Sequence, residues 1–173
     1  MRKTTTLALI ATGLIALGCG SGAADTSTSS GGGKGEDAPA KTAKVGEAAR
    51  DGKFEFTVKS AKCGVTKVGS DLLGQKAQGQ FCLVTVNVKN IGKEAQMFDG
   101  SSQKAYAADG TEYSADTGAA IYANKNAETF LNDVNPGNQV SGVVVFDIPK
   151  KVKIAKLELH DSPFSGGVDV SLG

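Results

Sequence analysis

The sequence predicts an all-β fold, an antiparallel sandwich of six to eight short strands. Three observations lead to this fold class. Apolar and polar residues alternate with a period of two in several short stretches. Turn residues separate these stretches, and no stretch has the apolar stripe of an amphipathic helix. Because no helical segment alternates with the strands, a parallel sheet is excluded and a sandwich is favoured.

The strands follow from the alternation, element by element. The clearest alternation runs through Phe54, Phe56 and Val58. Asp109-Gly110 predicts a hairpin turn, because both residues tolerate positive φ. We expect strands within residues 54–58, 82–88, 103–107, 111–114, 140–148, 155–159 and 168–172. Residues 119–131 are too sparsely apolar for a helical stripe, so we expect a long loop there, with one short strand near Thr129.

Only part of the 173 residues can form a core. Between Gly20 and Lys44 there is no Leu, Ile, Val, Met or aromatic residue. Such a segment cannot bury enough apolar surface to offset its ordering entropy. We therefore expect residues 19–44 to form a flexible Gly/Ser/Ala tether and residues 45–173 to form one folded domain.

The first residues have the features of an export signal. Arg2 and Lys3 precede an apolar run over residues 7–17, which is too short to span a bilayer as a helix. Gly18 and Cys19 close the run, and this order resembles a bacterial lipoprotein signal. The resemblance implies that residues 1–18 are removed and that Cys19 is lipidated, which would hold the protein on the outer face of the cell membrane. An ordinary secretory signal with a chance cysteine is the alternative.

The charge excludes nucleic acid as a partner. The full chain has a formal net charge of +1, and loss of Arg2 and Lys3 leaves 17 basic and 18 acidic residues. No basic patch is dense enough to track a phosphate backbone. The densest cluster, Lys150-Lys151-Val152-Lys153, is predicted to be a solvated turn, with a lipid-headgroup site as the alternative.

Two further cysteines, Cys63 and Cys82, predict a structural disulfide, because paired thiols in exported proteins are usually oxidised. A redox-active or metal-binding pair is the alternative, but neither cysteine lies in a Cys-x-x-Cys motif. The bridge would close a loop of about twenty residues and tie down the Gly-rich excursion over residues 64–80. Cys63 is out of register with Phe54, so we expect a bulge near Ser60-Ala61 or an early strand end.

Four motifs follow one another in residues 45–58, 84–92, 109–113 and 136–149. In this order they resemble the telokin-like surface lipoproteins of Gram-positive bacteria, a domain of unknown function. The fold of that family is related to that of a mycobacterial secreted immunoprotective antigen. The resemblance implies an immunoglobulin-like sandwich and offers no catalytic residues.

Candidate catalytic and metal sites are weak. One His, three Cys and no Trp leave most metal-centred and His-dependent chemistries without their residues, and we expect no cofactor. His160-Asp161-Ser162 contains suggestive residue types, but neighbours on a strand point to opposite faces, so we expect His160 at the exposed end of a strand. No closely spaced ligand series marks a calcium loop among the aspartates near loops, which are Asp99, Asp109, Asp116, Asp147 and Asp161.

The segment over residues 161–167 is the strongest candidate for a binding loop. Pro163 fixes the backbone beside Phe164, with small residues around them. Phe164 would either anchor a partner or fold back to cap the end of the sandwich. The same choice applies to Tyr106, Tyr113 and Tyr122, of which the first two are expected to pack across the predicted hairpin.

These observations favour a non-enzymatic binding domain, attached to the membrane by an N-terminal lipid, whose loops or edge strands contact an extracellular protein or envelope component. An accessory inhibitor of a secreted enzyme is one alternative, and a small metal-handling or hydrolytic lipoprotein is another. A cluster of titratable side chains in a pocket would favour chemistry. A protruding aromatic loop would favour binding.

Overall fold

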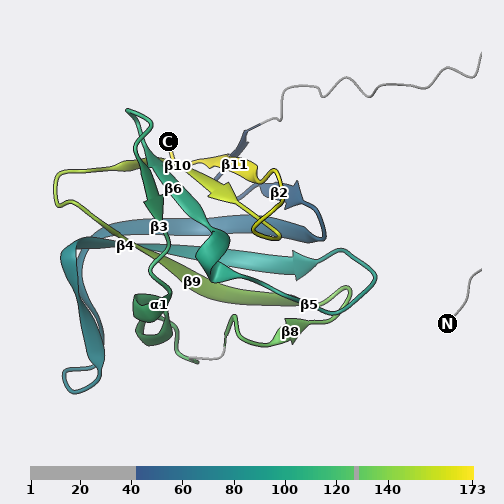
Figure 1. Ribbon diagram of the computed structural model, residues 1–173, viewed down its shortest axis with the longest axis horizontal. Helices are drawn as coiled ribbons and strands as arrows, with labels where there is room; N and C mark the ends of the chain where they lie inside the picture. Colours follow the sequence, from purple (N-terminus) through teal and green to yellow (C-terminus); the bar gives the residue numbers. More distant parts are fainter. Residues whose placement is uncertain (1–41, 127–128) are drawn as a thin grey trace, which may run out of the picture. The chain divides into compact units, whose positions relative to one another are not determined.

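The computed structural model of the protein describes residues 42–126 and 129–173 (Figure 1). The predicted signal segment, the predicted lipidation site Cys19 and residues 20–41 of the predicted tether lie outside the described residues. The described part forms two main sheets that pack on each other, as the alternation predicted. Every described strand pairs with another described strand, and the core is built from the same residues, so residues 42–173 contain what folding requires.

The first sheet has the order β2-β3-β4-β9 and the second has the order β1-β11-β10-β6-β7. A two-stranded sheet, β5-β8, lies beside them. Only β1 and β11 pair in parallel among the described strands. The bounds are β1 Ala43–Lys44, β2 Ala48–Asp51, β3 Phe54–Gly69, β4 Gly74–Asn90, β5 Gln96–Met97, β6 Lys104–Ala107, β7 Glu112–Ser114, β8 Asp133–Val134, β9 Gln139–Ile148, β10 Ile154–Leu159 and β11 Val168–Ser171. Eight described strands have three residues or more, which confirms the predicted six to eight.

The core lies between the two main sheets. Phe54, Phe56 and Val58 are completely buried on the inner face of β3. Leu157 and Leu159 of β10 face them from the second sheet and belong to the same buried cluster. The predicted alternation therefore identifies the inner face correctly. The domain begins slightly earlier than predicted, because β1 pairs with β11 and buries Ala43, two residues before the expected start at residue 45.

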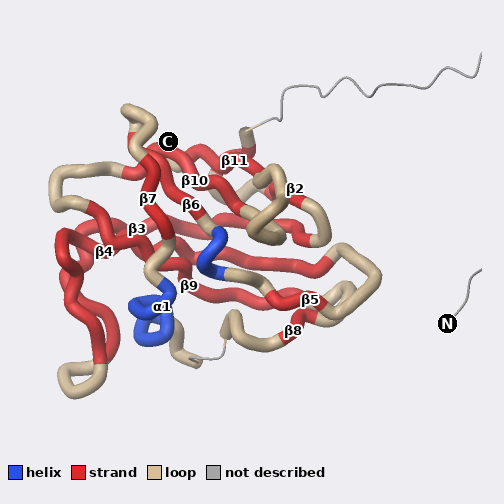
Figure 2. Tube along the Cα trace, in the orientation of Figure 1, coloured by secondary structure: helices blue, strands red, loops and turns tan. Residues whose placement is uncertain are grey.

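The prediction of a long loop over residues 119–131 was wrong. The helix α1 spans Thr117–Ala123, and Figure 2 shows it in blue beside the first sheet. Its seven residues are too few to show an apolar stripe, but Asp116 caps its N-terminus by accepting a hydrogen bond from the Ala119 backbone N–H. Buried Ala119 packs with Val68, Phe81 and Val145 on the outer face of the first sheet. The short strand of this region, β8, begins at Asp133 and not near Thr129.

The Gly-rich excursion over residues 64–80 is not a loop. It forms the distal half of a hairpin between β3 and β4, whose turn contains Ser70-Asp71-Leu72-Leu73. The pairing register shifts between Val58 and Ser60, which confirms the predicted bulge. A second shift follows Lys62, and the Cys63–Cys82 disulfide joins the two strands there.

Candidate functional site

Residues 160–167, named here the Phe164 loop, join β10 to β11 and present one aromatic side chain to solvent. Phe164 is 98% exposed, so of the two alternatives for this side chain the one in which it caps the end of the sandwich was wrong. Pro163 is also exposed. Exposure of an entire phenyl ring is unusual for an apolar side chain of this size and marks the loop as a candidate contact surface.

The start of the Phe164 loop is fixed to the turn between β2 and β3. The backbone N–H of Asp161 donates to the Asp51 carboxylate at 2.7 Å, and the Asp161 carboxylate accepts from the Lys53 N–H at 2.9 Å. These two bonds connect residues more than a hundred positions apart in the chain. The loop is therefore anchored to the first sheet as well as to its own strands.

His160 was expected to lie at an exposed strand end, and this was wrong, because only 8% of its surface is exposed. Its backbone N–H donates to Gln103 Oε1 at 2.9 Å, and its carbonyl accepts from Gln103 Nε2 at 3.0 Å. Gln103 is completely buried and also donates to the Asp99 carbonyl at 2.7 Å. This one amide satisfies the backbone groups of His160 after β10 has ended, which allows the residue to remain inside.

The His160 ring continues the bracing into the loop. Nε2 lies 2.8 Å from Glu158 Oε1, and Nδ1 lies 3.3 Å from Ser165 Oγ. A serine, an imidazole and a carboxylate in series are the residue types of a hydrolytic triad. The Ser165 hydroxyl also lies 3.0 Å from the Ser162 carbonyl, to which it can donate. These contacts tie Ser165 both to the His160 ring and to the backbone of its own loop, so they brace the loop.

Gly167 completes the bracing where the loop enters β11. Its φ is +71°, and a Cβ there would lie 2.7 Å from His160 Cε1. Only glycine fits both the backbone conformation and the close approach of the ring. The Phe164 loop is thus held at both ends and across its middle, while the Phe164 side chain remains exposed to solvent.

A cavity of about 160 Å³ lies between α1, the 3-10 helix η1 (Gly100–Ser102) and the β5–β8 region. We name it the apolar pocket. It is about the size that holds one aromatic ring. Met97, Ile121 and Leu131 are exposed at its rim. The lining residues are Met97, Phe98, Asp99, Gly100, Thr117, Ala120, Ile121, Asn124, Phe130 and Leu131.

Asp99 is the one ionisable group in the lining of the apolar pocket. Burial raises the pKa of Asp99, but hydrogen bonds from Ser101 and Ser102 outweigh burial and hold that pKa below its ordinary value. The carboxylate is therefore ionised at neutral pH and occupied as the cap of η1. Sequence reasoning missed this pocket because it depends on two short helices. The one feature of the sequence that marks these helices is the aspartate at the N-cap of each, Asp99 for η1 and Asp116 for α1, followed by a short stretch of polar or small residues.

The aspartates considered as calcium ligands all have structural roles. Each carboxylate accepts a hydrogen bond from at least one backbone N–H group. Asp99 accepts from Ser101, Asp109 from Thr111, and Asp116 from Ala119. Asp147 accepts from Gln78 and Gly79, and Asp161 accepts from Lys53. Among the described residues no group of three His, Cys, Asp or Glu side chains could hold a metal ion.

The tyrosines divide between packing and exposure. Tyr113 lies opposite Ala105 and packs against the core, and Tyr106 lies opposite Glu112 with its hydroxyl donating to that carboxylate at 3.1 Å. Both contact cross-strand neighbours, as predicted. Tyr122 is on the exposed side of α1. Lys156 Nζ lies 4.6 Å from the centre of the Tyr106 ring, so that ring face is already occupied by a cation.

No helix in the described part of the chain has the length and apolar character to cross a bilayer. The turn over residues 149–153, which contains the densest lysine cluster, is solvent-exposed between β9 and β10, as predicted, except for half-buried Val152.

Two solved structures share this fold at low sequence identity. The yjhA protein of Bacillus subtilis superposes with a TM-score of 0.53 at 15% identity, covering 76% of this chain and all of the other. The secreted protein MPT63 of Mycobacterium tuberculosis superposes with a TM-score of 0.54 at 15% identity, covering 76% of this chain and 95% of the other. Likeness at this identity shows the fold alone, and the fold is the one expected from the resemblance to a mycobacterial secreted protein.

Sequence comparison identifies a relative and a family. The uncharacterized protein YxkC of Bacillus subtilis (strain 168) is 31% identical over 118 residues, which cover 64% of this chain. The match spans 65% of the length of that relative. The family described as domain of unknown function (DUF4352) matches residues 43–170, nearly the whole of the described sandwich. The chain therefore belongs to the DUF4352 family, whose immunoglobulin-like β-sandwich it shares.

Proposed function

We propose that this protein is a lipid-anchored binding module on the outer face of the cell membrane, and that its Phe164 loop contacts an extracellular protein. One observation carries the proposal: a completely exposed phenyl ring stands on a loop that is hydrogen-bonded at both ends. The combination is typical of a recognition loop. A loop that served only to connect β10 to β11 would need neither feature.

The bracing supports binding because it reduces the entropy lost on association. A flexible loop must be ordered when a partner binds, and each immobilised side chain costs about 0.5–1.5 kcal/mol. In the Phe164 loop the backbone is already fixed by Asp51, Gln103 and Gly167. Aromatic side chains dominate the energetics of protein interfaces, so one exposed phenyl ring on a rigid loop is an effective anchor.

The chemistry of the apolar pocket also favours binding over catalysis. Its lining holds one carboxylate, already engaged as a helix cap, and no histidine, cysteine or lysine. A nucleophile with an adjacent base is absent from that lining.

The membrane anchor is supported by the sequence of the first 19 residues and by the resemblance to telokin-like surface lipoproteins. Arg2 and Lys3, the short apolar run and Gly18-Cys19 occur in the order of a lipoprotein signal. Metabolic labelling with an alkyne-bearing palmitate tests this assignment. Labelled protein is expected from the wild-type gene and none from Cys19→Ala, whereas labelling that survives Cys19→Ala would contradict it.

A photo-crosslinker in place of Phe164 tests the contact surface in the full-length protein on living cells. p-Benzoylphenylalanine at position 164 is expected to give one discrete crosslinked species. The matched control carries the same group at Asp109, which is exposed in the turn between β6 and β7. Equal crosslinking from both positions would overturn the proposal. If the crosslinked partner is an enzyme, the result would favour the alternative in which the Phe164 loop inhibits a secreted enzyme.

A further inference from the structure

We propose that the distal end of the β3–β4 hairpin, together with the turn that follows β9, docks on an anionic lipid bilayer, with Leu72 and Leu73 entering the boundary between headgroups and acyl chains. The inference rests on the proposed membrane anchoring and adds a second contact with the same membrane. It assigns this contact to a surface far from the Phe164 loop.

The hairpin turn over residues 70–73, named here the hairpin tip, exposes two large apolar side chains. Leu72 is 95% exposed and Leu73 is 72% exposed. The tip is closed by its own hydrogen bonds, from the Ser70 N–H to the Leu73 carbonyl at 2.7 Å and from the Leu73 N–H to Ser70 Oγ at 3.0 Å. In Figure 1 the distal hairpin extends away from the other strands at the lower left. The two leucines are thus presented on a narrow, self-contained projection.

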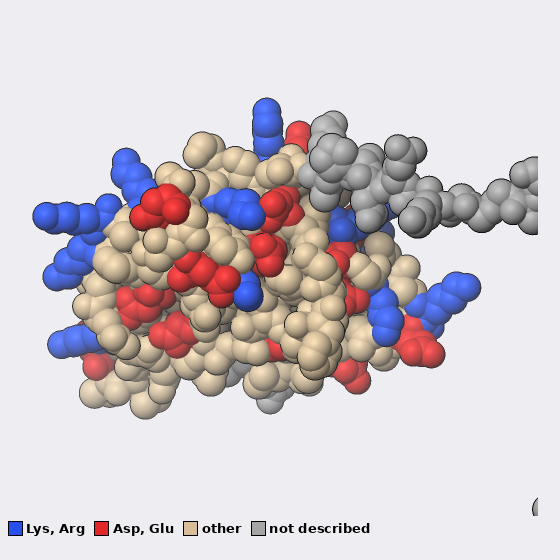
Figure 3. All heavy atoms as spheres, turned by 45° about the horizontal axis from the view of Figure 1, so that its top comes forward, with Lys and Arg blue, Asp and Glu red and all other residues tan. Residues whose placement is uncertain are grey.

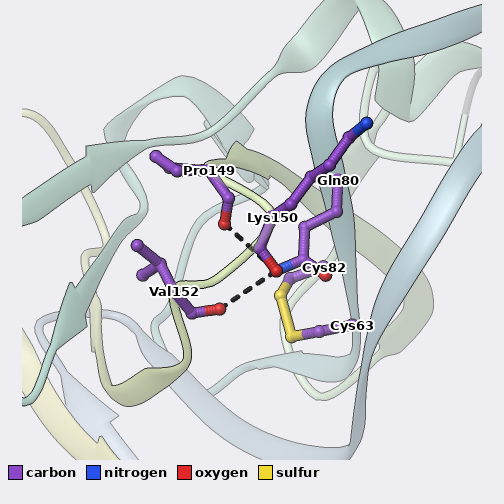
Figure 4. The surroundings of a disulfide bond; sticks show 6 residues. All are labelled: Cys63, Gln80, Cys82, Pro149, Lys150 and Val152. Carbon is purple, nitrogen blue, oxygen red and sulfur yellow. Dashed lines mark hydrogen bonds between the residues drawn. A yellow bond between two sulfur atoms is a disulfide. The ribbon is translucent and has the colours of Figure 1, made fainter.

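Lysines lie on the distal hairpin and on the turn beside its base. The distal hairpin contributes Lys67 and Lys76, with Lys62 just before it, and the turn over residues 149–153, named here the basic turn, contributes Lys150, Lys151 and Lys153. Figure 4 shows how the two segments are joined beside the disulfide. The Gln80 side-chain amide lies 3.0–3.2 Å from the carbonyls of Pro149, Lys150 and Val152. The basic turn is therefore fixed beside the base of the distal hairpin.

A second contact fixes the same junction. The Asp147 carboxylate, just before the basic turn, accepts hydrogen bonds from the backbone N–H groups of Gln78 at 2.6 Å and Gly79 at 3.0 Å. This acidic group is thereby directed at the backbone of β4 and not at the lysines. Asp71, the one acidic residue within residues 64–80, is exposed and paired with Lys67 at 3.1 Å.

Several lysines lie on the distal hairpin and the basic turn. Residues 42–173 contain fifteen basic and fifteen acidic residues, and five of the lysines lie on these two segments, with Lys62 as a sixth just before the distal hairpin. On the face shown in Figure 3, acidic side chains gather over the middle. Basic side chains project from the end at the left, where Figure 1 shows the hairpin and the β9–β10 connection, and others project from the top and the right. The lysines at the left end would attract an anionic surface.

Two of these lysines, Lys67 and Lys76, are direct cross-strand partners, and like charges directly opposite each other repel. Asp71 offsets part of this repulsion through its pair with Lys67, and an anionic surface would offset the remainder. Apolar tip and basic flanks together are the pattern of interfacial membrane binding, in which leucines enter the acyl boundary and lysines contact the headgroups.

A bilayer suits this surface better than a protein does. The tip is a two-stranded ribbon whose leucines have no surrounding rim of shaped surface, and a protein interface requires a packed core with a polar rim. A fluid bilayer requires only apolar depth and opposite charge.

Docking in this way does not occupy the Phe164 loop. Lys53, at the start of β3, holds Asp161 of that loop, and the hairpin tip lies at the other end of the same strand. Sixteen residues of strand extend over at most about 50 Å. The Phe164 loop and the hairpin tip are therefore attached at opposite ends of β3, so docking of the tip would leave the Phe164 loop free for another contact.

The absence of tryptophan from the chain allows a direct test. Residues 42–173 carrying Leu72→Trp are mixed with vesicles of phosphatidylglycerol and phosphatidylcholine in equal parts. We expect the Trp emission to shift to the blue with these vesicles and not with pure phosphatidylcholine, and we expect added salt to reduce the shift. The matched control, Phe164→Trp, is equally exposed and is expected to stay unshifted. A shift at position 164 but not at position 72 would overturn the proposal.

Substitutions then separate the lysines from the leucines. Vesicle binding is expected to fall about fivefold for each lysine removed, so Lys150→Gln, Lys151→Gln and Lys153→Gln together should lower it about a hundredfold. The matched triple variant removes the exposed Lys89, Lys93 and Lys125 and is expected to stay within a factor of about two. Equal losses in the two triple variants would contradict a localised docking surface. Replacing Leu72 and Leu73 with Ser should cost about tenfold or more.

These measurements distinguish the two membrane contacts, because residues 42–173 lack Cys19. If palmitate labels the full-length protein but the folded domain ignores anionic vesicles, the docking surface is wrong and the anchor stands. If the domain binds the vesicles but palmitate does not label Cys19, the anchor is wrong and the docking surface stands.

Discussion

The Phe164 loop and the hairpin tip both expose large apolar side chains, but the chain supports them in different ways. The Phe164 loop is held by Asp51, Gln103 and the His160 ring, all from outside its exposed part. The hairpin tip is closed only by bonds within residues 70–73 and lies among lysines. A braced aromatic suits a partner with a fixed shape, whereas an unbraced apolar tip with basic flanks suits a surface that supplies charge and adapts its shape.

The strongest test of the comparison removes the bracing from one region only. Gln103→Leu keeps the approximate volume of the side chain but leaves the backbone N–H and carbonyl of His160 buried without partners. We expect the free energy of unfolding of residues 42–173 to fall by about 4 kcal/mol in urea titrations. Amide exchange should accelerate in the Phe164 loop and not at the hairpin tip. Gln139→Leu, at an exposed position of β9, is the control, and equal losses in the two variants would contradict the bracing role.

The complementary test weakens the hairpin. Replacing Cys63 and Cys82 with Ala removes a bridge between residues 19 positions apart. The unfolded chain regains loop-closure entropy, so the free energy of unfolding should fall by about 3 kcal/mol. Hydrogen exchange should report faster opening beyond Lys62, with the Phe164 loop unchanged. Wild-type protein in reducing agent should behave in the same way, and a reduced protein of unchanged stability would argue against the structural role of the bridge.

A smaller effect is expected from two neighbouring glycines of the Phe164 loop. Gly167→Ala places a methyl group against the His160 ring at a positive φ and should cost about 1–2 kcal/mol. Gly166→Ala meets no atom within 4 Å and lacks a positive φ, so its stability should remain within about 0.5 kcal/mol of the wild-type value. Thermal unfolding of both variants gives the comparison. Equal melting temperatures would mean that the ring does not support the loop.

The smallest expected effect is on the pH dependence of stability and concerns Tyr106 of β6, which belongs to neither of the two regions. Burial and then the hydrogen bond to Glu112 raise the pKa of the Tyr106 hydroxyl above its ordinary value. The folded state therefore keeps this proton more tightly than the unfolded state does, and stability is complete below about pH 10 and declines as the pH rises further. Tyr106→Phe should flatten the alkaline part of the stability profile in urea titrations. An unchanged slope would contradict the raised pKa.

Most of the sandwich could be predicted from the sequence, because the alternation of apolar and polar residues along a strand identifies the side chains that face the core. The burial of Phe54, Phe56 and Val58 could be predicted without knowing which residues they pack against. The disulfide could be predicted because only two cysteines follow Cys19. The burial of His160 could not be predicted, because it depends on Gln103, 57 residues earlier in the chain. The direction of Phe164 was equally undetermined, since a turn of Pro, Ser and Gly has no period. The apolar pocket required α1, a helix too short to show a stripe.

The parallel pairing of β1 with β11 joins the first described strand to the last. Ala43 lies opposite Val170, and both are buried in the core. The two residues are separated by 127 positions, so this one pairing encloses nearly the whole described domain. Contacts between residues so far apart slow folding, because loop-closure entropy must be offset before such contacts add stability. Deletion of β11 would leave β1 without its partner strand in the sheet of β1, β11, β10, β6 and β7.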